Sequence, residues 1–310
     1  MNQRKKIYLF IGVFLCLGLV FYFSQRYYLN FQQVKKRQLA EKLRLEAWQN
    51  LENRLQEEII QFKGVSGVVV KDLNTGWEFT HNKDKKFAAA SLTKIPIMAS
   101  TFLATKEGRI KLDRNVALKS ADKLSGSGAL KNLPSGTTFS VEKLIGLMIY
   151  DSDNTATNIV TNLVGIDYLK DSFKSFGLKN TNISRRVADY QARKKGIENY
   201  TTAEDMAFLL EQIYYRRLIN RDISERCINL LKLTRLNDRI PKYLPADITV
   251  AHKTGLERRV CHDAGIVFTC KGDFIIVVLT KHKNSHSTLS KEYIAKMASY
   301  VYNYFSDLNQ

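Results

Sequence analysis

Hydrophobic residues follow different patterns in successive parts of the chain. The first part is an uninterrupted apolar run of 17 residues over 7–23. The second, over 31–62, contains no Gly or Pro and carries apolar residues such as Leu39, Leu43 and Leu51 at helical spacing. The remainder begins and ends with β-prone segments. The pattern therefore predicts an apolar helix, a helical connector and a folded domain.

Short β-prone runs mark both ends of the folded domain. Near its start, 67–70 and 77–80 are joined by a turn-rich segment, DLNTG, which predicts a hairpin. Near its end, further runs follow at 248–252, 264–270 and 274–281, while the middle is mostly helical in pattern. This order predicts an α+β fold, in which both ends of the chain form one five-stranded antiparallel sheet packed with a mainly helical lobe.

The apolar run has the features of a membrane anchor. Arg4, Lys5 and Lys6 precede it, and its 17 residues cover roughly 25 Å as a helix, near the lower limit for a bilayer. The basic cluster favours a cytoplasmic N-terminus. A cleaved signal peptide is the alternative, but its apolar core is shorter and it ends in small residues. The predicted organisation is a cytoplasmic tip over 1–6, a transmembrane anchor over 7–23, a stalk helix over 24–50 and a folded domain over 51–310.

Composition and charge narrow the class of partner. The 310 residues are 45% hydrophobic and 25% charged, which is typical of a folded protein rather than a disordered one. The formal net charge is +18, about +5 from residues 1–62 and about +13 from the rest. Such charge suits nucleic acid, an anionic membrane or an anionic wall polymer. Because the anchor places the domain outside the cytoplasm, we expect no nucleic acid partner.

Three short motifs carry the candidate chemistry. The first, SLTK, opens a predicted helix, and its three-residue spacing places Lys94 beside the Ser91 hydroxyl, whose proton it can take. The same spacing occurs at Ser120, so this motif is weak by itself. SDN at Ser152 and KTG at Lys253 are, taken singly, an N-cap cluster and a strand end. Their order along one chain is what makes them specific.

In this order, the motifs resemble the SxxK, SDN and KTG signature of the penicillin-recognising serine enzymes, and the SDN form resembles class A β-lactamases. The resemblance covers about 51–304, including FAAAS before the nucleophile and HDAG after KTG. It implies a β-lactamase/transpeptidase-like fold and a mechanism without a cofactor. We expect no metal either, because His282 and His286 have helical spacing but lack a third ligand.

The resemblance implies a role for each residue of the chemical step. Ser91 is the nucleophile that becomes acylated, and Lys94 is the base or proton relay that activates it. Ser152 passes a proton to the leaving nitrogen. The backbone N–H groups of Ser91 and Leu256 form the oxyanion hole.

A second set of residues is implied to bind the substrate. Asn154 holds the substrate amide, while Lys253, Thr254 and Gly255 bind the carboxylate that β-lactams and D-Ala-D-Ala peptides share. Ser127 belongs to an SGSG segment that corresponds to a loop at the mouth of the cleft, and a flexible glycine turn is an equally good interpretation of that segment.

One departure concerns the release of the acyl group. Efficient class A β-lactamases carry a Glu in a loop of pattern R-x-E-P-x-L-N, where it activates water. Counted back from the Thr-Thr pair at 201–202, Arg185 matches, but Val187 stands where the Glu is expected. Asp189 and Glu198 are the nearest carboxylates, and a displaced carboxylate rarely reproduces such geometry. We therefore expect impaired hydrolysis, with Asp189 as an uncertain substitute.

Three hypotheses of function stay open. The chain is a class A β-lactamase-type hydrolase, a penicillin-binding D,D-peptidase or transpeptidase acting on peptidoglycan stem peptides, or a non-catalytic wall-binding module. The replaced Glu and the retained anchor favour the second, while overall similarity favours the first. In each case the expected location is a bacterial cell membrane, with a single span, the N-terminus inside and the catalytic domain outside.

Overall fold

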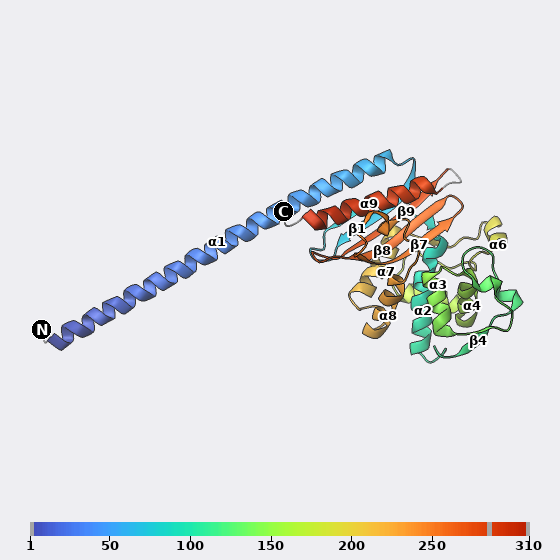
Figure 1. Ribbon diagram of the computed structural model, residues 1–310, viewed down its shortest axis with the longest axis horizontal. Helices are drawn as coiled ribbons and strands as arrows, with labels where there is room; N and C mark the ends of the chain where they lie inside the picture. Colours follow the sequence, from blue (N-terminus) through green and yellow to red (C-terminus); the bar gives the residue numbers. More distant parts are fainter. Residues whose placement is uncertain (1–2, 284–286, 308–310) are drawn as a thin grey trace. The chain divides into compact units, whose positions relative to one another are not determined.

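The computed structural model describes residues 3–283 and 287–307, which fall into two compact units, Met1–Asn53 and Arg54–Gln310 (Figure 1). The first unit consists of the N-terminal part of α1 (Gln3–Gln61), a helix of 59 residues. Within the described part of the chain, no helix is both long enough and apolar enough to span a membrane, so the predicted anchor over 7–23 is not confirmed. Residues 1–2 of the predicted tip, and His286, lie outside the described residues.

The second unit combines strands and helices. Its strands are β1 (Gly64–Asp72), β2 (Glu78–His81), β3 (Phe87–Ala88), β4 (Asn115–Ala117), β5 (Thr138–Ser140), β6 (Tyr200–Thr201), β7 (Thr249–Glu257), β8 (Val260–Phe268) and β9 (Phe274–His282). Its α-helices are α2 (Lys94–Lys106), α3 (Val141–Tyr150), α4 (Asn154–Val164), α5 (Ile166–Ser175), α6 (Tyr190–Lys194), α7 (Ala203–Tyr214), α8 (Arg221–Lys232) and α9 (Thr288–Asp307). The 3-10 turns are η1 (Ala90–Thr93), η2 (Ser120–Asp122), η3 (Leu130–Asn132) and η4 (Ile240–Tyr243).

The predicted five-stranded antiparallel sheet is confirmed. Its order is β2-β1-β9-β8-β7, so that strands from the two ends of the second unit lie side by side. The pairing of β1 with β9 places Val69 opposite Val277. Residues 274–280 of β9 are buried without alternation, because helices cover both faces of the sheet: α9 lies on one face and α7 on the other (Figure 1).

The last turns of α1 also belong to this domain, where they lie along α9. The guanidinium of Arg54 stacks over the ring of Tyr300 at 4.7 Å, and Glu58 pairs with Lys296 at 3.4 Å. These contacts connect the first helix of the domain to its last one. They explain why the helical pattern of the sequence continues into the folded domain.

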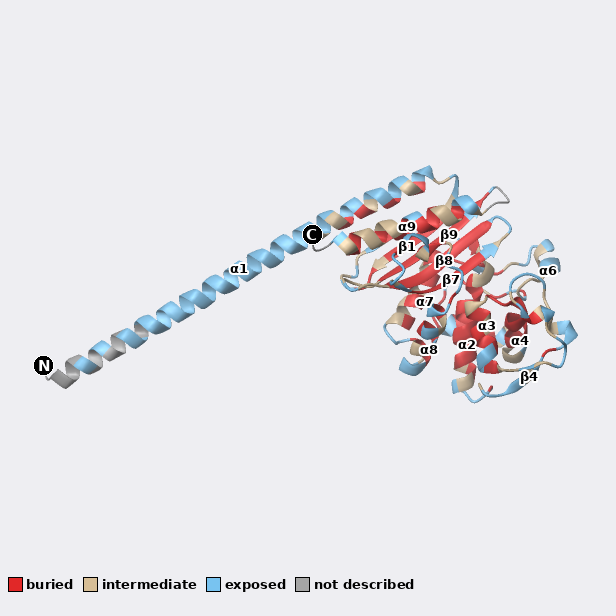
Figure 2. Cartoon of the chain, viewed as in Figure 1, coloured by how far each residue is buried: buried red, intermediate tan, exposed pale blue. Residues whose placement is uncertain are grey.

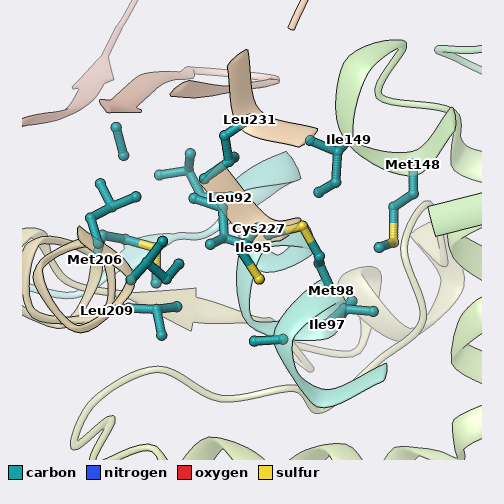
Figure 3. Close-up of a cluster of buried hydrophobic side chains, with 14 of the residues drawn as sticks. Leu92, Ile95, Ile97, Met98, Met148, Ile149, Met206, Leu209, Cys227 and Leu231 are labelled. Atoms are coloured by element: carbon teal, nitrogen blue, oxygen red, sulfur yellow. The ribbon is translucent and has the colours of Figure 1, made fainter. Parts of the chain in front are cut away.

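The hydrophobic core of the helical lobe surrounds α2. Figure 3 shows Leu92 and Ile95 among side chains from α3, α7 and α8, including Met148, Met206 and Cys227. Figure 2 shows α2 as mostly buried, and Lys94 through Phe102 are all buried. Because this helix is packed on every side, its first turn and the η1 turn before it have a fixed position.

Candidate active site

Ser91 lies in η1, directly before α2. Ala90 adopts φ +47°, a left-handed conformation that a residue with a side chain rarely takes and that often occurs at functional sites. The Thr93 hydroxyl closes the turn by donating to the Ala90 carbonyl at 3.0 Å. Leu92 and Thr93 are buried, whereas Ser91 is half-buried. The turn therefore presents the serine at a surface, at the positive end of a buried helix.

Lys94 is fully buried one turn after Ser91. Its Nζ donates to the Ser152 carbonyl at 2.6 Å, to Ser152 Oγ at 3.0 Å and to Asn154 Oδ1 at 3.0 Å. Burial, and next the positive charge of Lys253, hold the pKa of Lys94 well below its usual value. A lysine that loses its proton easily has a lone pair available, as a base must. Within the described residues its hydrogen bonds go to the SDN segment rather than to Ser91.

Ser152 joins the two lysines of the site. Its Oγ lies 3.0 Å from Lys94 Nζ and 3.0 Å from Lys253 Nζ, and both ammonium groups donate to it. A hydroxyl accepts two hydrogen bonds and donates one, so its own proton is left to donate to a third group. The residue is buried at φ +53°, a strained backbone for a serine. It occupies the position of a proton shuttle.

The loop that contains Ser127 is bound to the SDN segment. The Asn154 backbone N–H donates to the Ser127 carbonyl at 3.0 Å, and Asn154 Nδ2 donates to the Ser125 carbonyl at 3.1 Å. A Cβ at Gly128, where φ is +99°, would lie 2.1 Å from the Asp153 carboxylate. Only glycine fits there. The loop thus fixes the Asn154 side chain through its backbone, and the Ser127 side chain is exposed.

The KTG motif lies on β7, the edge strand nearest Ser91. Lys253 is fully buried, and burial lowers its pKa to about 7, against the opposing effect of Asp263. A Cβ on Gly255 would lie 3.4 Å from the Cβ of Ala90, which places this part of β7 next to the η1 turn. Thr254 is buried beside it, while the Leu256 side chain is 48% exposed.

His262 supports this arrangement from β8. The Thr280 N–H donates to His262 Nδ1 at 3.0 Å, which leaves the ring proton on Nε2, where it is donated to the Ala88 carbonyl at 2.9 Å. Burial lowers the pKa of His262 to about 4, so the ring is neutral. It connects the sheet to the strand that precedes the nucleophile, which is a structural role.

The loop before α7 contains Val187, which stands where a water-activating Glu is expected, and the two nearest carboxylates, Asp189 and Glu198. Val187 is half-buried. Asp189 caps α6, accepting the Ala192 N–H on Oδ1 at 2.9 Å. Glu198 accepts from Arg185 Nε at 2.8 Å and pairs with Arg193. Both carboxylates therefore have bonding partners inside the loop.

Glu198 belongs to a larger group, the ion-pair cluster, which consists of Arg185, Arg193, Glu198 and Glu257. Glu257, at the end of β7, pairs with Arg193 at 2.7 Å and with Arg185 at 3.5 Å. The cluster connects the loop to the KTG strand two residues beyond Gly255. Sequence reasoning missed it, because the partners are 64 and 72 residues apart and follow no periodic pattern.

The structure brings the motif residues together at one place. Ser91 comes from η1, the two lysines come from α2 and β7, and Ser152 comes from the connection between α3 and α4. Among the described residues, no group of three or more His, Cys, Asp and Glu side chains is placed to hold a metal. A serine beside two buried lysines with lowered pKa, joined by a second serine, is a site for acyl transfer to a hydroxyl. Fold and site together define a serine hydrolase of the penicillin-recognising class.

The family model described as the Beta-lactamase enzyme family matches residues 50–305, and the chain belongs to this family. Among curated relatives, the β-lactamase VEB-1 of Pseudomonas aeruginosa is 24% identical over 258 residues, covering 77% of this chain and 85% of that protein. A β-lactamase of Streptomyces lavendulae is 27% identical over 241 residues, covering 75% and 79%.

Solved structures agree with this assignment. The crystal structure of a β-lactamase from Sphaerobacter thermophilus superposes with a TM-score of 0.76 at 28% identity, covering 84% of this chain and 98% of that one. PBP-A gives a TM-score of 0.76 at 27% identity, covering 83% and 96%. A mutant of PBP-A, also 27% identical, has been captured as an acyl-enzyme with penicillin G.

Proposed function

We propose that the protein is an extracytoplasmic serine enzyme that β-lactams or D-Ala-D-Ala-like peptides acylate at Ser91, and that its acyl-enzyme is hydrolysed slowly. The observation that carries this proposal is the hydrogen-bonded series Lys94–Ser152–Lys253 beside the turn that presents Ser91. A module that only bound wall polymers would have no need of two buried lysines whose pKa values are lowered, because burying them costs folding free energy.

Acylation proceeds by proton transfer through this series. Lys94, as the neutral amine, takes the proton of Ser91 Oγ while the oxygen attacks the substrate carbonyl carbon. The backbone N–H groups of Ser91 and Leu256 stabilise the oxyanion. The C–N bond then breaks as Ser152 donates its proton to the leaving nitrogen, and Lys94 returns the proton to Ser152. The new Ser91 ester retains the acyl group.

Substrate binding uses the remaining motif residues. Lys253 and Thr254 face the substrate carboxylate, for which a buried ammonium supplies positive potential. Gly255 lies on β7 next to the η1 turn that carries Ser91, so the two ends of the substrate are held by neighbouring segments. Asn154, fixed by Lys94 and the Ser125 carbonyl, presents its remaining amide N–H to the substrate amide.

Slow hydrolysis follows from the loop. Removing the acyl group requires a base that positions and deprotonates water. Val187 offers none, Asp189 caps α6, and Glu198 is paired with two arginines. Moving either carboxylate toward the ester would break these bonds. The acyl group is therefore formed faster than it is removed.

A D,D-peptidase or transpeptidase of peptidoglycan is the second candidate. The absence of a Glu at position 187 favours it, and so does the likeness to PBP-A, whose mutant is known as a penicillin G acyl-enzyme. Such an enzyme passes the acyl group of its natural substrate to an acceptor amine or to water. Release of D-alanine from a synthetic D-Ala-D-Ala pentapeptide, at a rate above that of penicillin turnover, distinguishes this candidate from the first.

The test of the acylation site is labelling followed by peptide mapping. The full-length chain is mixed with a penicillin and digested, and the modified peptide is sequenced by mass spectrometry. We expect one adduct, on Ser91, and none in the Ser91→Ala variant. An unmodified wild-type protein that also leaves the penicillin intact would contradict both enzymatic candidates and leave the non-catalytic wall-binding module. An adduct on another serine would contradict the assigned nucleophile.

The N-terminal region fits this activity if it holds the enzyme at the outer side of a bacterial cell membrane. The apolar run over 7–23, with basic residues before it, supports a single span with the N-terminus inside, and the +13 charge of the following domain suits anionic lipid and wall polymers. We expect the protein in the membrane fraction of cells, and degraded when protease is added from outside. Full protection of the domain in intact spheroplasts would contradict this location.

A further inference from the structure

A groove lined by basic side chains lies at one end of the sheet, and we call it the polybasic groove. It has a volume of about 1010 Å³. Its floor contains the apolar side chains of Phe62, Val65 and Phe87. Its basic residues come from four segments: Lys63 after α1, Lys85 and Lys86 between β2 and β3, Arg259 in the β7–β8 turn, and Lys281 and Lys283 around the end of β9.

The described residues that line this groove contribute basic charge and no acidic charge. Among its described lining residues none is Asp or Glu, and within 3–283 and 287–307 none of its six basic side chains forms an ion pair. All six are exposed. Elsewhere on the domain, basic side chains commonly pair, as Lys71 does with Glu211 and Arg226 with Asp222. Concentrated, unpaired positive charge raises the free energy of the folded state, and a bound anion relieves it.

The backbone under the groove is held by the sheet. Val65 and Val260 both pair with Lys281, from the two sides of β9. The His282 N–H donates to the Arg259 carbonyl at 2.9 Å, and Arg259 itself is held at φ +67° in the tight turn. The backbone that carries Arg259 and Lys281 is thus in place before any ligand arrives, so binding there orders little backbone.

The groove continues toward the active site through Arg259. This residue also lines a second cleft of about 620 Å³ between α6 and the β7–β8 turn, together with Lys194, Arg258 and Leu256. Leu256 is the residue that directly follows KTG. The carboxylate in this cleft, Glu257, is already paired with Arg193 at 2.7 Å. Positive charge therefore extends from the groove to the rim of the catalytic site.

We propose that the polybasic groove binds an anionic polymer that carries repeated phosphate groups, alongside the catalytic cleft. A single phosphate would occupy one part of one cleft, whereas a chain reaches both. Lysine predominates among the basic residues of the groove. Its compact charge can bind phosphates in variable positions, whereas an arginine favours one bidentate contact with a single phosphate. The polymer would be one of the cell wall if the protein has the location proposed above, but binding itself needs neither that location nor acylation of Ser91.

The test compares two triple variants of equal net charge. The first, Lys85→Gln with Lys86→Gln and Lys281→Gln, removes three charges from the groove. The second removes three exposed lysines that line neither cleft, by Lys106→Gln with Lys111→Gln and Lys179→Gln. Binding of fluorescein-labelled long-chain polyphosphate to the full-length protein in non-ionic detergent is followed by anisotropy at several salt concentrations.

We expect the groove variant to bind polyphosphate about tenfold more weakly, and the control variant to stay within about twofold of wild type. The slope of log affinity against log salt becomes shallower by about 2 to 3 in the groove variant only. Equal weakening in both variants would mean that net charge alone attracts the polymer, and it would overturn the proposal. So would the absence of binding by wild type.

Competition separates the possible sources of phosphate. Unlabelled polyphosphate should displace the probe far better, per phosphate, than inorganic phosphate or glycerophosphoglycerol, the headgroup of a common anionic lipid. Equal competition per phosphate by either small molecule, or stronger competition by micelles doped with phosphatidylglycerol, would overturn a polymer site in favour of a simple phosphate or membrane site. Labelling of Ser91 by penicillin in the same samples should be unchanged in both variants. Polyphosphate binding without labelling of the wild type would contradict the proposed function and leave the groove proposal standing, whereas labelling without polyphosphate binding would do the reverse.

Discussion

The two sides of the catalytic cleft differ in what their charged groups are bonded to. On the side of the three motifs, Lys94 and Lys253 both donate to the Ser152 hydroxyl, whose own proton is left to donate to a third group. In the loop over 185–198, Asp189 caps a helix and Glu198 pairs with two arginines. Under the proposed function, forming and removing the acyl group depend on separate groups, and in the loop both carboxylates are already bonded to other partners.

The largest expected effect concerns the motif side. Replacing Lys94 with alanine removes the base and one donor to Ser152, so we expect acylation of Ser91 by a fluorescent penicillin to slow by about 10³-fold or more. Thermal unfolding in the same buffer is the control, because a folded variant isolates the chemical role. Acylation within tenfold of wild type would show that another group activates Ser91.

The ion-pair cluster is expected to stabilise the loop, and its buried pair should contribute more than its peripheral pair. Glu198→Gln leaves the Arg185 guanidinium, whose side chain is 3% exposed, with only the more distant charge of Glu257. We expect the free energy of unfolding to fall by about 3 kcal/mol in a denaturant titration. The matched variant Arg193→Gln, at a position 28% exposed, should cost about 1 kcal/mol or less. Equal losses would contradict the distinction between a buried and a peripheral pair.

Introducing a carboxylate at position 187 would give the loop over 185–198 a base of its own, which the three motifs already have in Lys94. In Val187→Glu the new side chain starts from a half-buried position in the loop, and we expect deacylation of a penicillin adduct to accelerate by about a hundredfold. Val187→Gln has nearly the same shape without a base and should leave the rate unchanged. If the glutamine variant accelerates release equally, the loop geometry rather than the missing base limits hydrolysis.

The smallest effect is the pH dependence of acylation. The neutral form of Lys94 is the active one, so the rate rises with pH through its lowered pKa, while the charged form of Lys253, whose pKa is about 7, binds the substrate carboxylate. The second-order acylation rate should therefore rise and then decline by about tenfold above pH 7. Lys253→Arg stays charged and should remove the decline. A decline of the same size in that variant would assign it to another group.

The sequence predicted the parts of the molecule that local patterns and motifs encode. Alternating and continuous apolar runs at both ends of the domain indicated the five-stranded sheet, and the order of SxxK, SDN and KTG indicated which residues would meet. The bonding of Lys94 to Ser152 and Asn154 was not predictable, because helical spacing only places Lys94 near Ser91. The direction of the Lys94 side chain depends on the packing of α2 against α4.

Long-range charge pairing was the other missed feature. In the sequence, the arginines of the loop over 185–198 form a basic segment. In the structure, Arg185 and Arg193 are neutralised by Glu198 and by Glu257, which lies at the end of β7. Six unpaired basic side chains gather instead in the polybasic groove, whose residues come from four separate segments. Composition gives the size of a net charge, and only the fold determines where it remains unpaired.

The lifetime of the acyl-enzyme tests the central claim most directly. The full-length wild-type protein is mixed with excess penicillin, the excess is removed, and the intact mass is followed with time. We expect an adduct that forms within the mixing period and then decays more slowly than it formed. Rapid consumption of penicillin with unmodified protein as the dominant species throughout would contradict it, because the loop would then contain an efficient deacylating base.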